Sequence, residues 1–471
     1  MKKEKETSTR NLVLLYILYG ILFALFIFKM FFYANEINDV PDQIAHLSYV
    51  IYLEEHPEKI IPQFENVKLY EMLDQFQDGN STITVYEKTN DTIYMSHPPF
   101  YYKFMQLCDV VEVSAGRAYV NTEKLCGINI FITSLTMILI LLTGFHKLLQ
   151  YRVDWTIHFL FAAICTCLPL YGYVGSGVNN DNLCNLAMVI FWMGLISYID
   201  NRYCVKTYWL IAAGLILSVC SKLTAGLIIL LVSTIIVLAD IFVNKKATII
   251  CNKYFLMTIP AYVIVLCYFV IIYSRYGSFQ PSYIAFVTDE EYKASMFYVE
   301  EAMRTNLTLG ESIKYYCSSL LSTWMGTYSI RYGIYRTGIL AFPFTLVLLL
   351  FLVWAIVSLC KFLKNRELGT HIISFAIAAA VIVMMVVQFI RYWSGYLITG
   401  YMGGCQARYY APCLPALAFG VCELVCESVK KCGKIRERVV QMVTVLMGIL
   451  LIYADFFYFV LSYYGSHYDG Y

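Results

Sequence analysis

Long apolar segments separated by polar connections are the feature that most constrains the fold of this chain. A membrane-spanning helix needs about 20 predominantly apolar residues. About eleven segments approach or reach that length, at residues 12–34, 125–145, 155–173, 183–198, 208–220, 223–242, 255–273, 339–359, 372–390, 411–429 and 439–461. Only 14% of the 471 residues are charged, whereas soluble domains have about 25%. We therefore predict an all-α polytopic membrane protein of about eleven transmembrane helices, folded as a single domain over residues 1–471.

The distribution of lysine and arginine predicts the orientation of these helices. Cytoplasmic connections carry the excess of Lys and Arg, and the basic residues of this chain gather in alternate connections, beginning with the N-terminal segment. The pattern predicts a multi-pass plasma-membrane protein with a cytoplasmic N-terminus and an external C-terminus. A hairpin at the break between Ser221 and Lys222 is needed to keep the later loops on the sides that their charges require. Two long loops, residues 35–124 and 274–338, then lie on the external face, and their many aromatic residues suggest short interfacial helices.

Composition and motifs exclude several functional classes. The net charge of +2 and the lack of a long basic tract give no indication of a nucleic-acid partner. The sixteen cysteines are scattered without a CxxC pair or a zinc-site spacing, so the sequence predicts no disulfide framework. No Walker loop, GxSxG or HExxH motif is present. The absence of an internal repeat argues against an inverted-repeat transporter.

Acidic and imidazole groups directly follow the first span. Asp39 and Asp42 lie close to the predicted end of that helix, and His46 follows Asp42 by one helical turn. Pro41 would start the next helix, which places Asp42 and His46 on one face. A carboxylate screened from water has a raised proton affinity, which suits a general base. Asp42 equally suits a helix cap, and Asp39 suits a solvated loop.

Two further polar motifs lie in predicted external segments. The sequence from His97 to Phe100 closes the first long loop, where two prolines favour an extended segment leading into a helix with an aromatic face. It suits a packing motif or, because it shares the loop of Asp42, a binding role. Asp181, in the run Asn179–Asn180–Asp181–Asn182, would cap the following helix or line a polar cavity.

A set of cations falls on the same predicted face. Lysine between apolar segments is costly unless it meets an anion, and arginine and lysine both bind phosphate. We favour phosphate contact for Lys222 and Arg408. For Arg331 and Arg336 we favour interaction with lipid head groups, where long basic side chains commonly reach. The remaining external cation, Arg391, follows the ninth span.

Taken in order, these motifs resemble the GT-C superfamily of membrane glycosyltransferases. They are PDQIAH at 41–46, HPPF at 97–100, NND at 179–181, KLTAG at 222–226, WMG at 324–326 and QARYYAPCLP at 406–415. The resemblance extends over nearly the whole chain. It is strongest to a bacterial branch of predicted membrane proteins, whose members typically read PDE-x-x-H after the first span and QGRY later. This chain departs from that pattern at Gln43 and Ala407.

The resemblance implies a fold and a reaction. It implies a GT-C fold, with Asp42 as catalytic base and Asp39 as the carboxylate that would have to replace the glutamate lost at Gln43. That loss bears on any divalent metal cofactor, Mg²⁺ or Mn²⁺. His46, His97 and Asp181 would bind substrate, and Lys222 and Arg408 would bind a lipid-linked phosphate.

The expected function is transfer of a sugar, with inversion, from a polyprenyl-phosphate carrier to a glycan, lipid or protein acceptor of the cell envelope. Two alternatives remain open. The first is a transporter or flippase of a lipid-linked glycan, although its ionisable residues would be expected near the middle of the bilayer. The second is an inactive scaffold of an envelope complex, which the departure at Gln43 favours.

Overall fold

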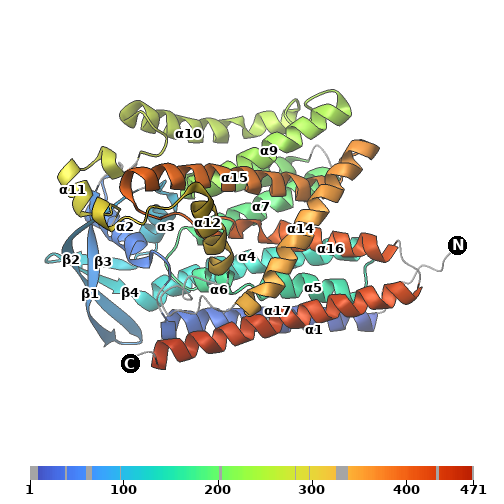
Figure 1. Ribbon diagram of the computed structural model, residues 1–471, viewed down its shortest axis with the longest axis horizontal. Coiled ribbons are helices and arrows are strands. Elements are labelled where there is room, and N and C mark those ends of the chain that lie inside the picture. Colours follow the sequence, from blue (N-terminus) through green and yellow to red (C-terminus); the bar gives the residue numbers. More distant parts are fainter. Residues whose placement is uncertain are drawn as a thin grey trace.

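The computed structural model describes residues 9–37, 40–59, 66–95, 97–200, 204–281, 283–295, 297–324, 338–430 and 434–468. Helices dominate this part of the chain. The long ones are α1 (Thr9–Phe32), α4 (Thr122–Gln150), α5 (Trp155–Thr166), α7 (Asp181–Asp200), α8 (Val205–Ser221), α9 (Leu223–Asn244), α10 (Lys253–Tyr276), α14 (Gly338–Asn365), α15 (Thr370–Thr399), α16 (Leu414–Lys430) and α17 (Lys434–Tyr468). They pack side by side into an elongated bundle (Figure 1).

The helices agree with the apolar segments read from the sequence. Within the described ranges, nine helices are long and apolar enough to cross a membrane. The segment at 155–173 forms a tenth candidate span, in which α5 and α6 (Pro169–Gly175) meet at a 46° bend. Pro169 begins α6, and a proline without an N–H cannot continue the preceding helix. The eleventh segment is α8, a shorter apolar helix of 17 residues. The prediction of a polytopic helical membrane protein is confirmed.

The first long loop contains a sheet that the sequence analysis did not predict. After the π-helical turn η1 (Tyr33–Ile37) and α2 (Gln43–Glu55), the loop forms β1 (Asn66–Asp78), β2 (Ser81–Tyr94), α3 (Phe100–Leu107), β3 (Val111–Ser114) and β4 (Arg117–Asn121). The strands are antiparallel in the order β1-β2-β4-β3. Gly79, with φ of 61°, takes the first position of the two-residue turn between β1 and β2, where a positive φ favours glycine.

The sheet lies at one end of the bundle, together with α2 and α3 (Figure 1). A small hydrophobic core joins these elements and includes Leu47, Val67, Tyr101, Val120 and Leu125. This core is separate from the larger one between the membrane helices. The end of α1 therefore leads directly into a packed extramembrane unit.

The second long loop reaches the same end of the bundle. It contains η2 (Tyr283–Ala285), α11 (Asp289–Ala294), η3 (Glu301–Met303) and α12 (Leu309–Thr323). Tyr283 is hydrogen-bonded through its hydroxyl to Thr92 of β2, at 3.2 Å. The N–H of Val299 donates to the carbonyl oxygen of Thr399 at the end of α15, at 2.8 Å. Both long loops thus lie at one end of the bundle, and the assignment of that end to the external face stays a prediction.

Candidate active site

Four charged side chains from distant parts of the sequence meet at this end of the bundle, and we call them the charge cluster: Asp42, Asp181, Lys222 and Arg408. A terminal nitrogen of Arg408 (Nη2) donates to the carboxylate of Asp42. The Nε of Arg408 lies 3.9 Å from Oδ2 of Asp181, and the other oxygen of Asp181 lies 2.5 Å from Nζ of Lys222. The four groups therefore alternate in sign, and their formal charges cancel.

Three members of the charge cluster are deeply buried. Asp181 is 2% exposed, Lys222 is 4% exposed and Arg408 is 3% exposed, whereas the side chain of Asp42 is 56% exposed. Nε of Arg408 and Oδ2 of Asp181 have no hydrogen-bond partner among the described residues. Burying charges is costly unless they are paired. The structure therefore holds these charges in place and leaves Asp42 as the member that faces outward.

Local backbone structure places the two cations. Lys222 lies between α8 and α9 in an extended conformation, with φ of −154° and ψ of 118°. This is the helix break expected at Ser221 and Lys222. The neighbouring Ser221 carbonyl accepts a hydrogen bond from Asn180 at 3.0 Å. Arg408 lies in the short 3₁₀ turn η5 (Ala407–Tyr409), ahead of η6 (Ala411–Cys413), and it also donates through Nη1 to the carbonyl oxygen of Pro41 at 3.2 Å.

The asparagine-rich turn before α7 orients Asp181. The side chain of Asn179 accepts a hydrogen bond from the N–H of Asp181 at 2.9 Å and donates to the carbonyl oxygen of Pro41 at 3.0 Å. Asn182 donates to Asn129 of α4 at 2.9 Å. The carboxylate of Asp181 pairs with Lys222. Asp181 is also the first residue of α7, and its expected role in lining a substrate cavity stays a prediction.

Asp42 is not a side-chain helix cap. It precedes α2 in the left-handed region, with φ of 58° and ψ of 18°, and its side chain makes no capping hydrogen bond. A non-glycine residue in this region costs on the order of 1–3 kcal/mol and is concentrated at functional sites. The carboxylate of Asp42 instead accepts a hydrogen bond from Arg408.

The expected rise in the proton affinity of Asp42 is wrong for this state of the protein. The Arg408 guanidinium beside it holds the pKa of the Asp42 carboxyl well below its usual range, and this effect outweighs the partial loss of hydration of the carboxylate, which acts in the opposite direction. His46 and Lys222 lower the pKa further. Asp42 is therefore an ionised carboxylate while Arg408 is its partner.

The two motif histidines lie side by side. The rings of His46 and His97 are stacked with centroids 6.0 Å apart, and Nδ1 of His46 is 2.7 Å from the hydroxyl of Tyr102. Burial lowers the pKa of His46 to about 4 and holds that of His97 well below its usual value. Both imidazoles are therefore neutral near pH 7. Nδ1 of His97 is buried and has no hydrogen-bond partner within the described residues.

The remaining predicted residues lie elsewhere. Asp39, Arg331 and Arg336 fall outside the described residues. Gln43 is buried, and its side chain lies against Gly177. A Cβ atom added at Gly177 would be only 2.3 Å from Oε1 of Gln43. The side chain of Gln43 therefore packs against the turn before α7.

The described residues do not fit a divalent metal. They contain no group of three or more His, Cys, Asp or Glu side chains that could hold an ion. Asp42 and Asp181 have Arg408 and Lys222 as their respective partners, whereas Mg²⁺ requires oxygen ligands in near-octahedral geometry.

Two features of this region were missed by sequence reasoning. The ring of Tyr409 lies 4.8 Å from Nζ of Lys222 and 5.6 Å from the guanidinium carbon of Arg408. The position of Tyr409 next to Arg408 in the sequence could have indicated this contact.

The second feature is a buried ion pair between Lys29 of α1 and Asp455 of α17. Lys29 also donates to the carbonyl oxygen of Thr166 at 3.2 Å, which fixes the end of α1 that leads to Asp42. In the sequence, the presence of opposite charges within the first and last spans could have indicated this ion pair.

Comparison with known proteins identifies the fold. No protein-family model and no curated protein matches the sequence. Among solved structures, ArnT from Cupriavidus metallidurans in the apo state aligns with 95% of this chain and 76% of its own, at 8% identity and a TM-score of 0.50. The chain has a GT-C fold.

Two other structures align with this chain at lower TM-scores. ArnT from the same organism bound to undecaprenyl phosphate covers 95% of this chain and 77% of its own, at 9% identity and a TM-score of 0.48. The oligosaccharyltransferase of Archaeoglobus fulgidus, in complex with Zn and sulfate, covers 80% of this chain and 45% of its own, at 14% identity and a TM-score of 0.40.

Proposed function

We propose that this protein is a glycosyltransferase that moves a sugar from a polyprenyl-phosphate carrier to an acceptor, with inversion, on the external face of the membrane. The observation that carries the proposal is the charge cluster, in which an outward-facing carboxylate adjoins two buried cations. The GT-C fold supports the reaction class. The acceptor would be a glycan, lipid or protein of the cell envelope.

Arg408 and Lys222 would bind the phosphate of the donor. Arginine offers a planar set of donors that matches phosphate, and lysine supplies a point charge. Their positions at the ends of apolar helices suit a lipid carrier, because its prenyl chain stays in the bilayer while its head reaches the cations. Positive charge placed at a leaving group in a water-poor site can lower a reaction barrier by several kcal/mol.

The net charge of the charge cluster predicts how the donor phosphate would bind there. The four groups are already neutral in sum, so a phosphate must replace one of the two carboxylates. Asp181 is 2% exposed and cannot turn towards water, whereas the Asp42 side chain is 56% exposed. The phosphate would therefore displace Asp42 from Arg408. Freed from the guanidinium, Asp42 would regain proton affinity at the moment when the donor is bound.

Asp42 would then act as general base. An acceptor hydroxyl oxygen forms a bond to the anomeric carbon from the side opposite the phosphate, and the bond between that carbon and the phosphate oxygen breaks. The hydroxyl proton passes to Asp42, and the bonding electrons leave with polyprenyl phosphate, which stays paired with Arg408 and Lys222. Attack from the opposite side inverts the anomeric configuration. Asp39 is the alternative carboxylate for this role.

His46, His97 and Asp181 would position the substrate. Both imidazoles are neutral and can donate or accept hydrogen bonds, which suits sugar hydroxyls. Tyr102 stacks on Tyr49 at a centroid distance of 3.9 Å and holds His46 through its hydroxyl. Asp181 would fix Lys222 in the orientation that meets the phosphate.

The test is an assay with purified protein, an extract of the cell envelope that supplies the acceptor, and a panel of synthetic undecaprenyl-phosphate monosaccharides, scored for release of undecaprenyl phosphate. We expect release by the native protein and loss of about 10²–10⁴-fold in an Asp42→Asn variant, the usual contribution of a general base. Glu112→Gln is the matched control, because Glu112 is an exposed carboxylate on β3 of the same extramembrane unit.

The outcomes of this assay separate the proposal from its rivals. Full activity of Asp42→Asn refutes the assignment of the base. Movement of the intact lipid-linked sugar across a vesicle membrane, without release of the carrier, would indicate a flippase. Binding of the donor with neither release nor movement would indicate an inactive scaffold.

A further inference from the structure

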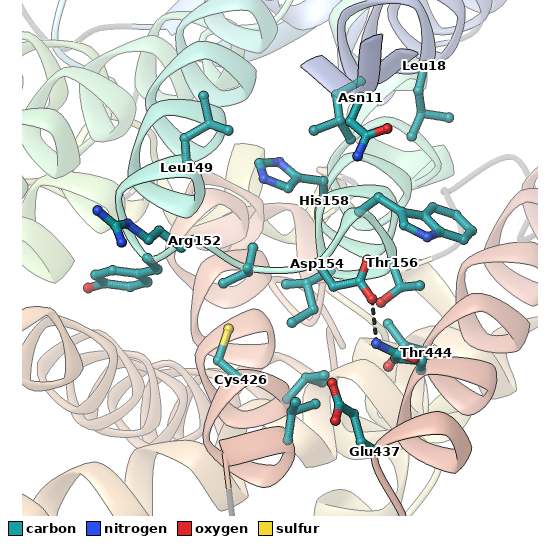
Figure 2. Close-up of a pocket in the computed structure, with 18 of the residues that line it drawn as sticks. Asn11, Leu18, Leu149, Arg152, Asp154, Thr156, His158, Cys426, Glu437 and Thr444 are labelled. Carbon is teal, nitrogen blue, oxygen red and sulfur yellow. Dashed lines mark hydrogen bonds between the residues drawn. The ribbon is translucent and has the colours of Figure 1, made fainter. Parts of the chain in front are cut away.

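A cavity of about 720 Å³ lies at the opposite end of the bundle from Asp42. It is lined by the first turns of α1, the connection between α4 and α5, the end of α16 and the first half of α17 (Figure 2). Asn11 lines it, whereas Asp42 follows the last turn of α1, so about 30 Å of helix separates the two sites. The cavity is therefore independent of the charge cluster.

Charges of both signs line this cavity. Arg152 and Lys430 supply positive charge, and Asp154 and Glu437 supply negative charge. In the view of Figure 2, Arg152 lies to the left of Asp154 and Glu437. The side-chain amide of Gln441 donates to Asp154 at 2.5 Å and holds that carboxylate at the cavity. A ligand that matches this lining carries both a cation and an anion.

The lining of the cavity also includes exposed apolar side chains. Leu14 of α1 lines it and is 55% exposed, as expected for a residue that faces acyl chains. Trp155 lines it and is 55% exposed as well. Tryptophan is enriched where membrane meets water, so the cavity lies at the level of the lipid head groups.

A deeply buried polar group in the wall has an unused hydrogen-bonding site. His158 is 1% exposed, and its Nδ1 lies 3.2 Å from the hydroxyl of Tyr19. Its Nε2 has no hydrogen-bond partner among the described residues, although His158 lines the cavity. Buried polar atoms are normally satisfied by protein, water or ligand. The wall therefore offers a ligand a hydrogen-bonding site below the charged rim.

We propose that this cavity binds one zwitterionic phospholipid whose head group carries a primary ammonium. The lipid phosphate pairs with Arg152 and Lys430, and the ammonium donates hydrogen bonds to Asp154 and Glu437. The acyl chains lie along the exposed face of α1 at Leu14. The cavity volume falls within the range of about 300–1,000 Å³ typical of small-molecule sites, which suits a head group with its glycerol.

The test is native mass spectrometry of the full-length protein in detergent, titrated with synthetic phosphatidylethanolamine, phosphatidylcholine or phosphatidylglycerol. We expect one retained phosphatidylethanolamine per protein. Phosphatidylcholine has no ammonium hydrogens and phosphatidylglycerol has no ammonium, so both should bind about tenfold more weakly, as expected for the loss of a charge-assisted hydrogen bond.

Variants at the rim separate the two halves of the head group. Glu437→Gln should abolish the preference for phosphatidylethanolamine over phosphatidylglycerol. Arg152→Gln and Lys430→Gln should weaken retention of all three lipids. Arg436→Gln is the matched control, because Arg436 is an exposed cation beside Glu437 that does not line the cavity. Equal retention of the three lipids, an unchanged preference in Glu437→Gln, or no retained lipid would each overturn the proposal.

Discussion

Arg408 and Asp42, 366 positions apart in the sequence, form an ion pair in which the arginine is buried and the aspartate faces outward. The pair joins the segment before α16 to the segment that follows α1. Because Nε of Arg408 faces Asp181, the guanidinium lies between two carboxylates. The proposed reaction depends on the exchange of one of these carboxylates for a lipid phosphate.

The first prediction concerns the cation itself. Arg408→Gln should reduce release of undecaprenyl phosphate by about 10²-fold or more, because the leaving group loses its main positive partner. The control variant Arg391→Gln removes an exposed arginine near the C-terminal end of α15. Its rate should stay within about twofold of the rate of the native protein. Equal losses in the two variants would show that general surface charge, rather than the position of Arg408, supports the reaction.

The second prediction uses the buried pair of Lys222 and Asp181. Lys222→Gln alone should destabilise the protein by about 3–5 kcal/mol, because it leaves Asp181 buried without its cation. The double variant Lys222→Gln with Asp181→Asn should recover thermal stability, measured by a melting curve in detergent, while transfer stays low. If the double variant regains transfer together with stability, Lys222 has only a structural role.

The third prediction is a pH profile. Arg408 lowers the pKa of Asp42, so the residual activity of Arg408→Gln should fall at a higher pH than that of the native protein as the solution is acidified. Lys222 and His46 remain near Asp42 in this variant and keep part of the effect. The measurement is kcat/KM against pH for both proteins. An acid limb at the same pH in both would contradict the proposed control of Asp42 by Arg408.

The fourth prediction concerns stability against pH. Burial lowers the pKa of His46 from 6.5 to about 4, so the unfolded state binds more protons between these values. Stability should therefore fall as the pH drops from 6.5 to about 4, by at most about 3 kcal/mol for this residue. His46→Gln removes the titrating group, and its melting temperature should depend less on pH over that range. Parallel curves for the two proteins would show that His46 does not titrate as described.

The fifth prediction tests the position of Asp42 by steric means. A Cβ at Gly177 would lie 2.3 Å from Oε1 of Gln43 and 2.5 Å from Cγ2 of Val40, so Gly177→Ala should shift the segment that carries Asp42. We expect a cost of about 1–3 kcal/mol in stability and a clear loss of transfer. Gly310→Ala is the control, since nothing lies within 4 Å of its added Cβ. Unchanged transfer in Gly177→Ala would contradict a site that depends on the placement of this segment.

The membrane helices could be predicted from the sequence because their apolar length is a local property. The sheet could not. Its long β1–β2 hairpin is largely exposed, so residues 71–80 show no alternation of buried and exposed positions. Interfacial helices were expected there, and α2 and α3 account for only part of that loop.

The members of the charge cluster were predicted separately, but their arrangement was not. Lys222 and Arg408 stood out because each is a cation between apolar segments, and Asp42 stood out because it follows a span. The pairing of Arg408 with Asp42 depends on tertiary packing across most of the chain. For that reason the sequence predicted burial as the dominant effect on Asp42, whereas the neighbouring guanidinium dominates in the structure.

The most direct test of this account is an experimental structure of the protein with bound undecaprenyl phosphate. We predict density for the phosphate within hydrogen-bonding distance of both Arg408 and Lys222, with the Asp42 carboxylate turned away from Arg408. A phosphate bound elsewhere, with the Asp42–Arg408 pair intact, would contradict the proposed reaction.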